Sequence, residues 1–248
     1  MSVDTPEQME GLERAGRVVA ATLRALRGAV APGITTGSLD ELASGMFAAN
    51  GARSGPILTY GYPASICVSV DDEVVHGIPG GRILQLGQLV TLDVAAEVDG
   101  YHADAAVTVP VGSIDRAARR LIVATRAALS AGMRAAQPGA TLREVGAAVE
   151  RAAVSRGYRI LRELTGHGIG RAMHEEPTVY NWPAPDASTR LSPGLVFTIE
   201  PMLTAGRTRL VLDSDGWTVR TADGSLTAHA EHTIMVAKNG PVVLTARC

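Results

Sequence analysis

The sequence is poor in the features that nucleic-acid-binding, membrane and disulfide-rich proteins need. Aromatic residues make up only 4% of the 248 residues and the formal net charge is -2, which argues against a base-stacking platform or a basic nucleic-acid surface. Two cysteines, Cys67 and Cys248, are too few for a disulfide scaffold and fit a reducing compartment. No apolar run is long and uncharged enough to span a membrane, and acidic residues precede the first apolar stretch, unlike in a signal peptide. We therefore expect a cytoplasmic globular protein without a nucleic-acid or membrane partner.

The first fifty residues predict two helices joined by a turn. Residues 5–28 have apolar side chains at helical spacing, Thr5 suits the N-cap and Pro6 suits the first helical position. A Pro-Gly turn at residues 32–33 and a second helical stretch that ends near Gly51 follow.

The same order returns later in the chain. Residues 115–136 predict a helix, a Pro-Gly turn follows at residues 138–139, and another helix ends at Gly157. The matched spacing indicates an internal repeat, with halves of about residues 5–112 and 113–248.

Short β-branched and apolar runs predict strands in both halves, at residues 66–70, 89–98, 101–109, 195–199 and 232–236. Helix pairs followed by antiparallel hairpins favour an α+β fold over a doubly wound sheet. We expect two pseudo-symmetric halves around a mainly antiparallel sheet, packed into a single catalytic domain of residues 1–248.

One predicted hairpin brings two carboxylates together. Asp99-Gly100 is a typical two-residue hairpin loop, and that loop sets Ala95 opposite Asp104. Asp93 lies two residues before Ala95 and therefore shares its face of the strand. Asp93 and Asp104 would be diagonal neighbours on a mostly apolar hairpin, which is costly unless the carboxylates are protonated or bind cations. The alternative is a solvated outer face, but the small side chains around the pair leave room for ions.

Three further ionisable residues stand in apolar or glycine-rich surroundings. Glu200 ends an apolar run, Glu231 precedes another, and His167 lies within Thr-Gly-His-Gly-Ile-Gly, where glycines allow a close backbone approach. A single such residue is usually a satisfied core group. Together with the aspartate pair, the three favour a metal site.

Six segments in this order resemble one peptidase family. They are Val-Val-His76-Gly-Ile-Pro, Leu-Asp93-Val followed by Asp104, Gly-His167-Gly-Ile-Gly, Met-His174-Glu-Glu-Pro, Thr-Ile-Glu200-Pro-Met and Ala-Glu231-His-Thr-Ile. Together they resemble type I methionine aminopeptidase, from about residue 5 to the end of the sequence. The resemblance implies the pita-bread fold and the removal of N-terminal methionine from nascent proteins when the second residue is small and uncharged. The zinc-protease pattern His-Glu-x-x-His does not occur in the sequence.

The resemblance also implies a role for each matching residue. Asp93, Asp104, His167, Glu200 and Glu231 would hold two divalent cations, with Asp104 and Glu231 bridging them. This oxygen-rich ligand set suits Mn²⁺, Fe²⁺ or Co²⁺ at least as well as Zn²⁺.

Three of the matching residues would act on the substrate. Glu200 would accept a proton from the attacking water, His76 would contact the amide beyond the scissile bond, and His174 would donate a hydrogen bond to the substrate carbonyl.

The methionine pocket is where the sequence departs from the family. By resemblance it includes Tyr62, Cys67 and Trp217, although a plain core position for Cys67 and a surface position for Trp217 are the alternatives. Where family members often have Cys, Tyr and Phe, this chain has Pro56, Thr59 and Met173. A methionine still suits a thioether pocket, and Thr59 would open space and add a hydroxyl.

Other interpretations keep the same fold. A proline-directed aminopeptidase or prolidase shares the ligand pattern but usually has an additional N-terminal domain, for which no room precedes residue 5. A non-enzymatic binding protein or a metal-independent, creatinase-like hydrolase would not need all five ligands. The family's work implies nascent polypeptides as partners and a transient contact with the ribosome, and we expect a monomer. Two histidines beside ligands, His102 and His229, are expected to be either neighbours of the metal site or exposed.

Overall fold

The computed structural model describes residues 1–246, so Cys248 lies outside the described residues. The helices are α1 (Pro6–Ala29), α2 (Thr36–Ala49), α3 (Gly55–Tyr60), α4 (Arg116–Ala135) and α5 (Leu142–Val154). All except α3 lie where the repeat pattern predicts helices. In the described part of the chain, none of them has the length and apolar character needed to cross a membrane.

The strands of the first half are β1 (Arg53–Ser54), β2 (Cys67–Val70), β3 (Glu73–Val75), β4 (Leu89–Val98) and β5 (Tyr101–Pro110). Those of the second half are β6 (Arg159–Ile160), β7 (Gly166–Gly168), β8 (Glu175–Val179), β9 (Val196–Ile199), β10 (Met202–Thr204), β11 (Leu210–Leu212), β12 (Val219–Thr221), β13 (Thr227–His229), β14 (His232–Ala237) and β15 (Gly240–Val243). The two larger sheets have the orders β1-β4-β2, with β5 on β4, and β15-β14-β9-β7-β8. Their strand pairs are antiparallel, as predicted.

Helix α1 begins at a capping box. The Thr5 hydroxyl accepts a hydrogen bond from the Gln8 backbone N–H, and the Gln8 side chain accepts one from the Thr5 backbone N–H. These two bonds satisfy donors that a helix end otherwise leaves unpaired. The apolar face of α1 is buried, including Leu12, Val19, Leu23 and Leu26. Packing of this face, rather than propensity alone, stabilises the helix against the sheet.

The hairpin of β4 and β5 has the predicted register. Asp99 and Gly100 form its turn with φ values of 51° and 80°, the left-handed conformation that a two-residue hairpin loop requires. Ala95 lies opposite Asp104, and Asp93 lies opposite Ala106. The turn chemistry therefore determines which two carboxylates share one face of the sheet.

Residues of the second half are joined directly to β5. The Thr233 hydroxyl donates to the Asp104 carbonyl at 2.7 Å and accepts from the Asp104 N–H at 2.9 Å. The Glu231 N–H donates to the carbonyl of Ala106 at 2.9 Å. These bonds hold the aspartates of the first half and the glutamates of the second half in fixed relation.

The two halves have matching local geometry, as the repeat predicts. Thr35 caps α2 and Thr141 caps α5, and each also forms an isolated bridge with a following loop. Gly87 and Gly194, six residues before an acidic residue in each half, have φ values of 93° and 95°. The same sequence signals thus produce the same backbone turns twice.

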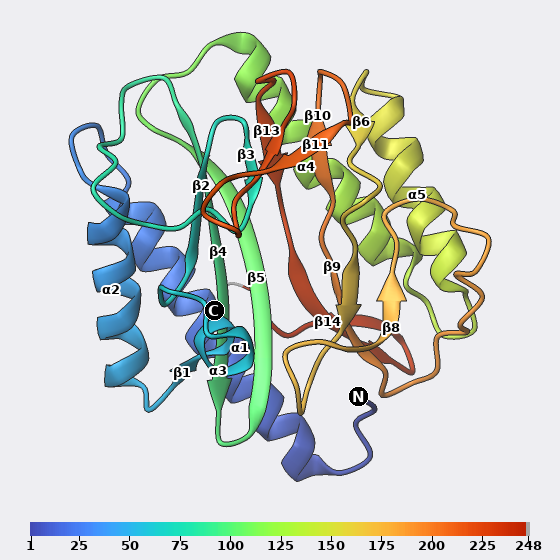
Figure 1. The fold of residues 1–248 in the computed structure, drawn as a ribbon. Helices are drawn as coiled ribbons and strands as arrows, with labels where there is room; N and C mark the ends of the chain where they lie inside the picture. Colours follow the sequence, from blue (N-terminus) through green and yellow to red (C-terminus); the bar gives the residue numbers. More distant parts are fainter. Residues whose placement is uncertain (247–248) are drawn as a thin grey trace.

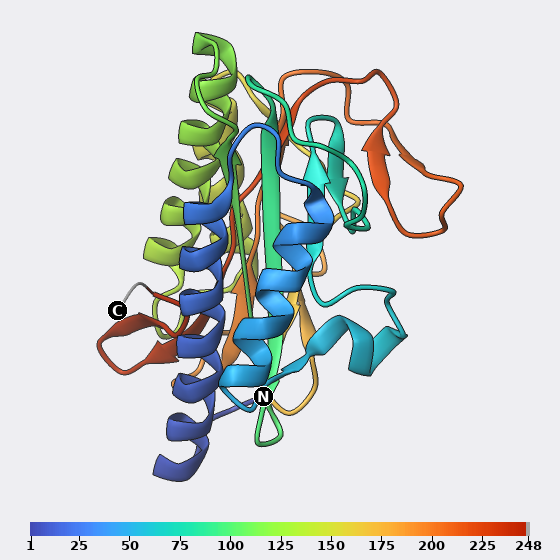
Figure 2. The same ribbon diagram turned by 90° about the vertical axis from the view of Figure 1, so that its left-hand side faces the viewer.

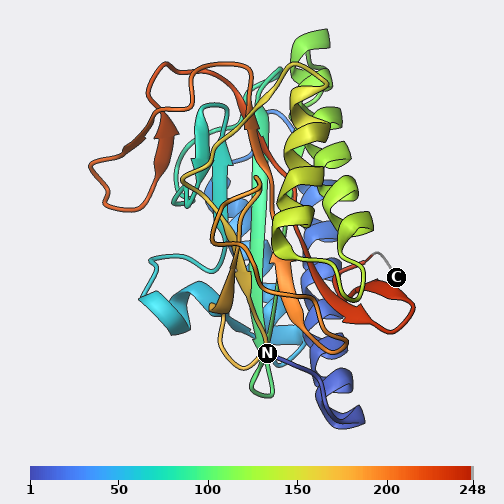
Figure 3. The same cartoon turned by 90° about the vertical axis from the view of Figure 1, so that its right-hand side faces the viewer.

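The helices and the strands form layers (Figure 1). Figures 2 and 3 show α1, α4 and α5 along one side of the strands, with α3 and the β11–β12 hairpin on the opposite side. One apolar core lies between α1, α2 and the first sheet, and another between α4, α5 and the second sheet. The side of the strands away from the long helices therefore remains available for the site.

Candidate active site

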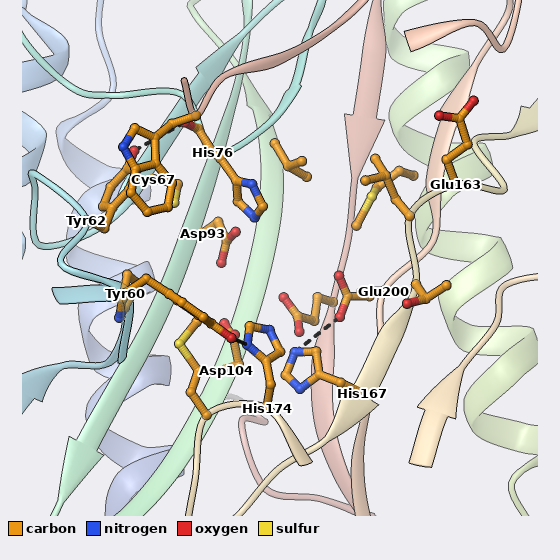
Figure 4. A pocket seen from close by; sticks show the side chains of 18 residues that line it. Tyr60, Tyr62, Cys67, His76, Asp93, Asp104, Glu163, His167, His174 and Glu200 are labelled. Carbon is orange, nitrogen blue, oxygen red and sulfur yellow. Dashed lines mark hydrogen bonds and ion pairs between the residues drawn. The ribbon is translucent and has the colours of Figure 1, made fainter. Parts of the chain in front are cut away.

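All the residues predicted as ligands or catalytic groups, and four of the predicted pocket residues, line one cavity of about 390 Å³. These are Tyr62, Cys67, His76, Asp93, Asp104, His167, Met173, His174, Glu200, Trp217 and Glu231. They come from both halves of the chain, and Figure 4 shows the side chains of His76, Asp93, His167, His174 and Glu200 pointing toward a common space. The folded chain brings together residues that are separated by more than half of its length.

The aspartates of the hairpin lie in this cavity wall, where Asp104 is buried and Asp93 is half-buried. Burial raises the pKa of Asp93 to about 6, because a carboxylate is poorly solvated there. Burial also raises the pKa of Asp104 well above its usual range, and the charges of Asp93 and Glu200 add to this. Asp104 is 4% exposed, which contradicts the alternative of a solvated face.

The glutamates of the second half face the aspartates. Glu200 follows β9 and accepts a hydrogen bond from the Thr198 hydroxyl at 2.8 Å. Burial raises the pKa of Glu200 to about 8. Burial and the neighbouring charges of Asp104 and Glu200 raise the pKa of Glu231 well above its usual range. Without cations, the fold therefore disfavours full ionisation of this cluster.

His167 lies on β7 beside the glutamates. Its Nε2 is 3.5 Å from Glu200 Oε1, and its Nδ1 is 2.9 Å from the Gly168 carbonyl, which orients the ring. Burial lowers the pKa of His167 to about 3, so the imidazole is neutral and can act as a ligand at neutral pH. A Cβ at Gly168 would lie 2.2 Å from the Glu176 carbonyl oxygen, which confirms the predicted close backbone approach.

The donor set fits divalent cations. Ligand atoms of Asp104, His167 and Glu231 lie within 4.8 Å of one another. Asp104 Oδ1 and Glu231 Oε1 are buried and have no hydrogen-bond partner among residues 1–246. Buried carboxylate oxygens without partners are costly, and cations would satisfy them.

His76 and His174 lie at the exposed rim of the cavity. His76 has a φ of 59°, a left-handed conformation that is uncommon outside glycine and points to a functional constraint. The His174 ring lies 3.9 Å from the His167 ring, centroid to centroid. His174 Nδ1 is hydrogen-bonded to the Tyr60 hydroxyl, as Figure 4 shows. In the tautomer in which the Tyr60 hydroxyl donates to Nδ1, the other ring nitrogen, Nε2, carries the proton and can donate it to a substrate.

The apolar part of the cavity contains the predicted pocket residues. Tyr62 is buried, donates to the Gly77 carbonyl at 2.8 Å and stacks edge-on against Trp217 at a centroid distance of 5.1 Å. Cys67 is buried, and burial raises the pKa of its thiol, so it stays neutral. Trp217 is half-buried and lines the cavity.

Two of the three departures from the family pattern lie in the cavity wall. Pro56 and Met173 line it, and both are buried. Thr59, which was expected to open space in the pocket, is exposed on α3 and does not line this cavity. Its neighbour Tyr60 lines the cavity in its place because the short helix α3 turns that side chain toward His174.

Sequence reasoning missed several lining residues: Tyr60, Val75, Glu163, Leu164, Thr165 and Met202. Met202 begins β10, two residues after Glu200. Tyr60 gave no signal, because α3 was not predicted. His102 and His229 are 8% and 2% exposed, so of the two alternatives considered for them the exposed one is wrong.

Comparisons with known proteins agree with this geometry. Residues 10–238 match the model of metallopeptidase family M24. The chain is 46% identical to methionine aminopeptidase 1 of Mycobacterium tuberculosis, over 96% of this chain and 92% of that protein. It is 40% identical to the methionine aminopeptidase of Escherichia coli K12, over 100% of this chain and 94% of that protein.

Solved structures extend the comparison to the fold. The crystal structure of methionine aminopeptidase from Thermotoga maritima has a TM-score of 0.96 and 36% identity, and all of each chain is covered. Prolidase from Pyrococcus furiosus has a TM-score of 0.78 over 99% of this chain and 66% of that one. At 21% identity, the prolidase shows a shared pita-bread fold alone.

Proposed function

This chain belongs to metallopeptidase family M24, and from that premise we propose that it is a metal-dependent aminopeptidase that removes N-terminal methionine from proteins. The observation that carries the proposal is the meeting of four carboxylates, three of them buried, and one neutral imidazole with an apolar pocket in a single cavity. The residues of both halves contribute, so we propose that residues 1–248 act as one catalytic domain.

The proposed metal centre contains two divalent cations. Asp93, Asp104 and Glu231 would hold one, and Asp104, Glu231, His167 and Glu200 the other. The unpartnered buried oxygens of Asp104 and Glu231 support a bridging role for these two residues. When bound, the cations polarise the scissile carbonyl and lower the pKa of the attacking water. Mn²⁺, Fe²⁺, Co²⁺ and Zn²⁺ all suit this ligand set.

The side chains of the chain move the proton and stabilise the developing charge. Glu200 accepts the proton of the attacking water on its carboxylate and passes it to the leaving amine nitrogen. The Thr198 hydroxyl donates to Glu200 Oε1 and so orients this carboxylate. His174 donates from Nε2 to the substrate carbonyl oxygen, since Tyr60 occupies Nδ1. His76 contacts the amide beyond the scissile bond.

The apolar wall supports selection of methionine. Tyr62, Cys67, Met173 and Trp217 surround the pocket with aromatic and sulfur-containing side chains, which contact a thioether favourably. The cavity of about 390 Å³ must also admit the second residue of the substrate. We therefore propose that the second residue is small and uncharged.

The partners are proposed to be the N-termini of nascent polypeptides in the cytoplasm, reached through a transient contact with the ribosome. We also propose a monomer, because the described residues of one chain supply every side chain of the proposed centre.

Peptide hydrolysis tests the proposed activity. Metal-stripped protein is assayed on Met-Ala-Ser, Ala-Ala-Ser, Met-Leu-Ser and X-Pro peptides, with Mn²⁺, Fe²⁺, Co²⁺ or Zn²⁺ returned singly. We expect metal-dependent release of methionine from Met-Ala-Ser, little turnover of the other peptides, and none with Glu200→Gln. Turnover of X-Pro peptides alone would move the protein to the proline-directed peptidases. Cations bound without any hydrolysis would contradict the assigned activity.

A further inference from the structure

His229 is a buried histidine that the proposed centre does not use. It ends β13, where it pairs with Met202 of β10. The Thr108 hydroxyl accepts from the His229 N–H at 2.8 Å and donates to its carbonyl at 3.0 Å, which fixes the backbone from both sides. Glu231 lies two residues further along the chain. The imidazole is therefore placed beside the metal cluster by main-chain bonds that do not involve its ring.

The ring of His229 lacks hydrogen-bond partners. The residue is 2% exposed, and within residues 1–246 neither Nδ1 nor Nε2 has a partner. Glu231 Oε1, in the facing carboxylate, is also buried without a partner in this part of the chain. Buried polar groups are almost always paired in native proteins, so two adjacent exceptions point to a site that binds a ligand.

The spacing around the ring fits a cation. His229 Nε2 lies 3.9 Å from Glu231 Oε2 and 4.0 Å from Glu200 Oε2. These separations are too long for a hydrogen bond. A divalent cation between nitrogen and oxygen forms bonds of about 2.1 Å to each and so spans up to roughly 4 Å. Ligand atoms of Glu200, His229 and Glu231 all lie within 4.8 Å of one another.

We propose that His229 is a metal-ligating residue of this chain, binding a divalent cation together with Glu200 and Glu231. The inference rests on the proposed metal centre and adds a second imidazole to it, besides His167. A larger share of nitrogen ligands favours Co²⁺, Fe²⁺ or Zn²⁺ over Mn²⁺. The centre therefore binds Co²⁺ more tightly, relative to Mn²⁺, than a centre with His167 as its only imidazole.

The test uses the protein loaded with Co²⁺ alone and needs no turnover. A histidine bound to paramagnetic Co²⁺ gives a strongly shifted, exchangeable N–H signal in proton NMR. The wild-type protein is expected to show signals from two histidines, and His229→Gln from one. In competition with a chelator, His229→Gln is expected to bind Co²⁺ at least about tenfold more weakly, because loss of a ligand or of its support typically costs 10–100-fold.

A matched control is available in the first half. His102 is 8% exposed, lies two residues before Asp104, and its Nδ1 also lacks a partner in the described structure. It lies opposite Glu97 in the hairpin and is not among the clustered ligand atoms. His102→Gln is therefore expected to keep both histidine signals and the wild-type affinity for Co²⁺.

Three results would overturn the inference. They are a single shifted histidine signal in the wild-type protein, an unchanged spectrum and affinity in His229→Gln, and an equal loss of affinity in His102→Gln. The first result needs no variant and so does not depend on the folding of one. A wild-type protein that binds no Co²⁺ would instead refute the proposed metal centre itself, whereas bound Co²⁺ without methionine release would refute only the activity.

Discussion

Glu200 should destabilise the metal-free protein at alkaline pH. Its pKa rises from 4.5 to about 8 on folding because the carboxyl is buried. The folded state therefore holds a proton between about pH 4.5 and 8 that the unfolded state has released. Under this condition the free energy of unfolding falls as pH rises. Each pKa unit corresponds to 1.36 kcal/mol, so the loss reaches about 5 kcal/mol above pH 8.

Replacing Glu200 by glutamine should remove this loss. The amide oxygen can still accept the hydrogen bond from Thr198, and no charge is buried. In chelator-treated protein at a pH of about 9, we expect Glu200→Gln to be more stable than the wild type by about 2–5 kcal/mol, the lower value allowing for water that enters the cleft on ionisation. At a pH of about 5 the two proteins should differ little. Urea denaturation at both pH values measures the free energies of unfolding.

Glu73 provides the matched control for this substitution. It is also a buried glutamate, but Arg82 and Arg220 each donate to it at 2.7 Å. Glu73→Gln should therefore destabilise the metal-free protein, by about 2 kcal/mol, because it removes hydrogen bonds to a charged group. The same chemical change thus has opposite signs at the two positions.

Addition of Mn²⁺ should reverse the order of wild type and Glu200→Gln. A cation that binds only the folded state stabilises it by RT ln(1 + [L]/Kd). Glutamine coordinates Mn²⁺ more weakly than glutamate does, so the variant gains less. If Glu200→Gln in the metal-free protein shows the wild-type dependence on pH, or is less stable than the wild type at a pH of about 9, the reasoning from buried charge is wrong.

Three further substitutions test the site. Tyr60→Phe should lower kcat about tenfold with little change in KM, because it removes the hydroxyl that fixes the tautomer of His174. The control, Tyr180→Phe, removes a hydroxyl that bonds an exposed aspartate and should leave steady-state kinetics unchanged. Gly168→Ala should lower the free energy of unfolding by about 3 kcal/mol and weaken Mn²⁺ binding, since its Cβ would lie 2.2 Å from a backbone oxygen. The control, Gly28→Ala, has nothing within 4 Å of its Cβ and should stabilise α1 by about 0.5–1 kcal/mol in thermal unfolding. Trp217→Ala should raise KM for methionyl peptides about tenfold, because the pocket loses an aromatic wall.

Turn and capping chemistry made the β4–β5 hairpin and the start of α1 predictable. Asp99-Gly100 set the register of the hairpin, and the structure has the predicted opposition of Ala95 and Asp104. Thr5 predicted the start of α1 because its hydroxyl satisfies a backbone donor within the same turn. These signals are local, so the sequence alone carries them.

The methionine pocket was less predictable. Thr59 and Tyr60 are adjacent, and only the formation of α3 decides that the tyrosine lines the cavity while the threonine is exposed. Six residues form this helix, with Ser54 as its N-cap and Gly61 as its C-cap. Such a short helix depends on contacts with the rest of the fold and has too few apolar positions to produce a periodic pattern.

The sequence by itself determined the family, the four long helices, the hairpin and the candidate ligands, because each is encoded by residues a few positions apart or by segments in a fixed order. Only the tertiary structure decided that His229 is buried against Glu200 and Glu231, and that Tyr60 bonds His174. Burial and distance between the halves depend on bonds such as that between Thr233 and Asp104, which are 129 residues apart. No local pattern reports such a contact, because the physical interaction exists only after the two halves have packed together.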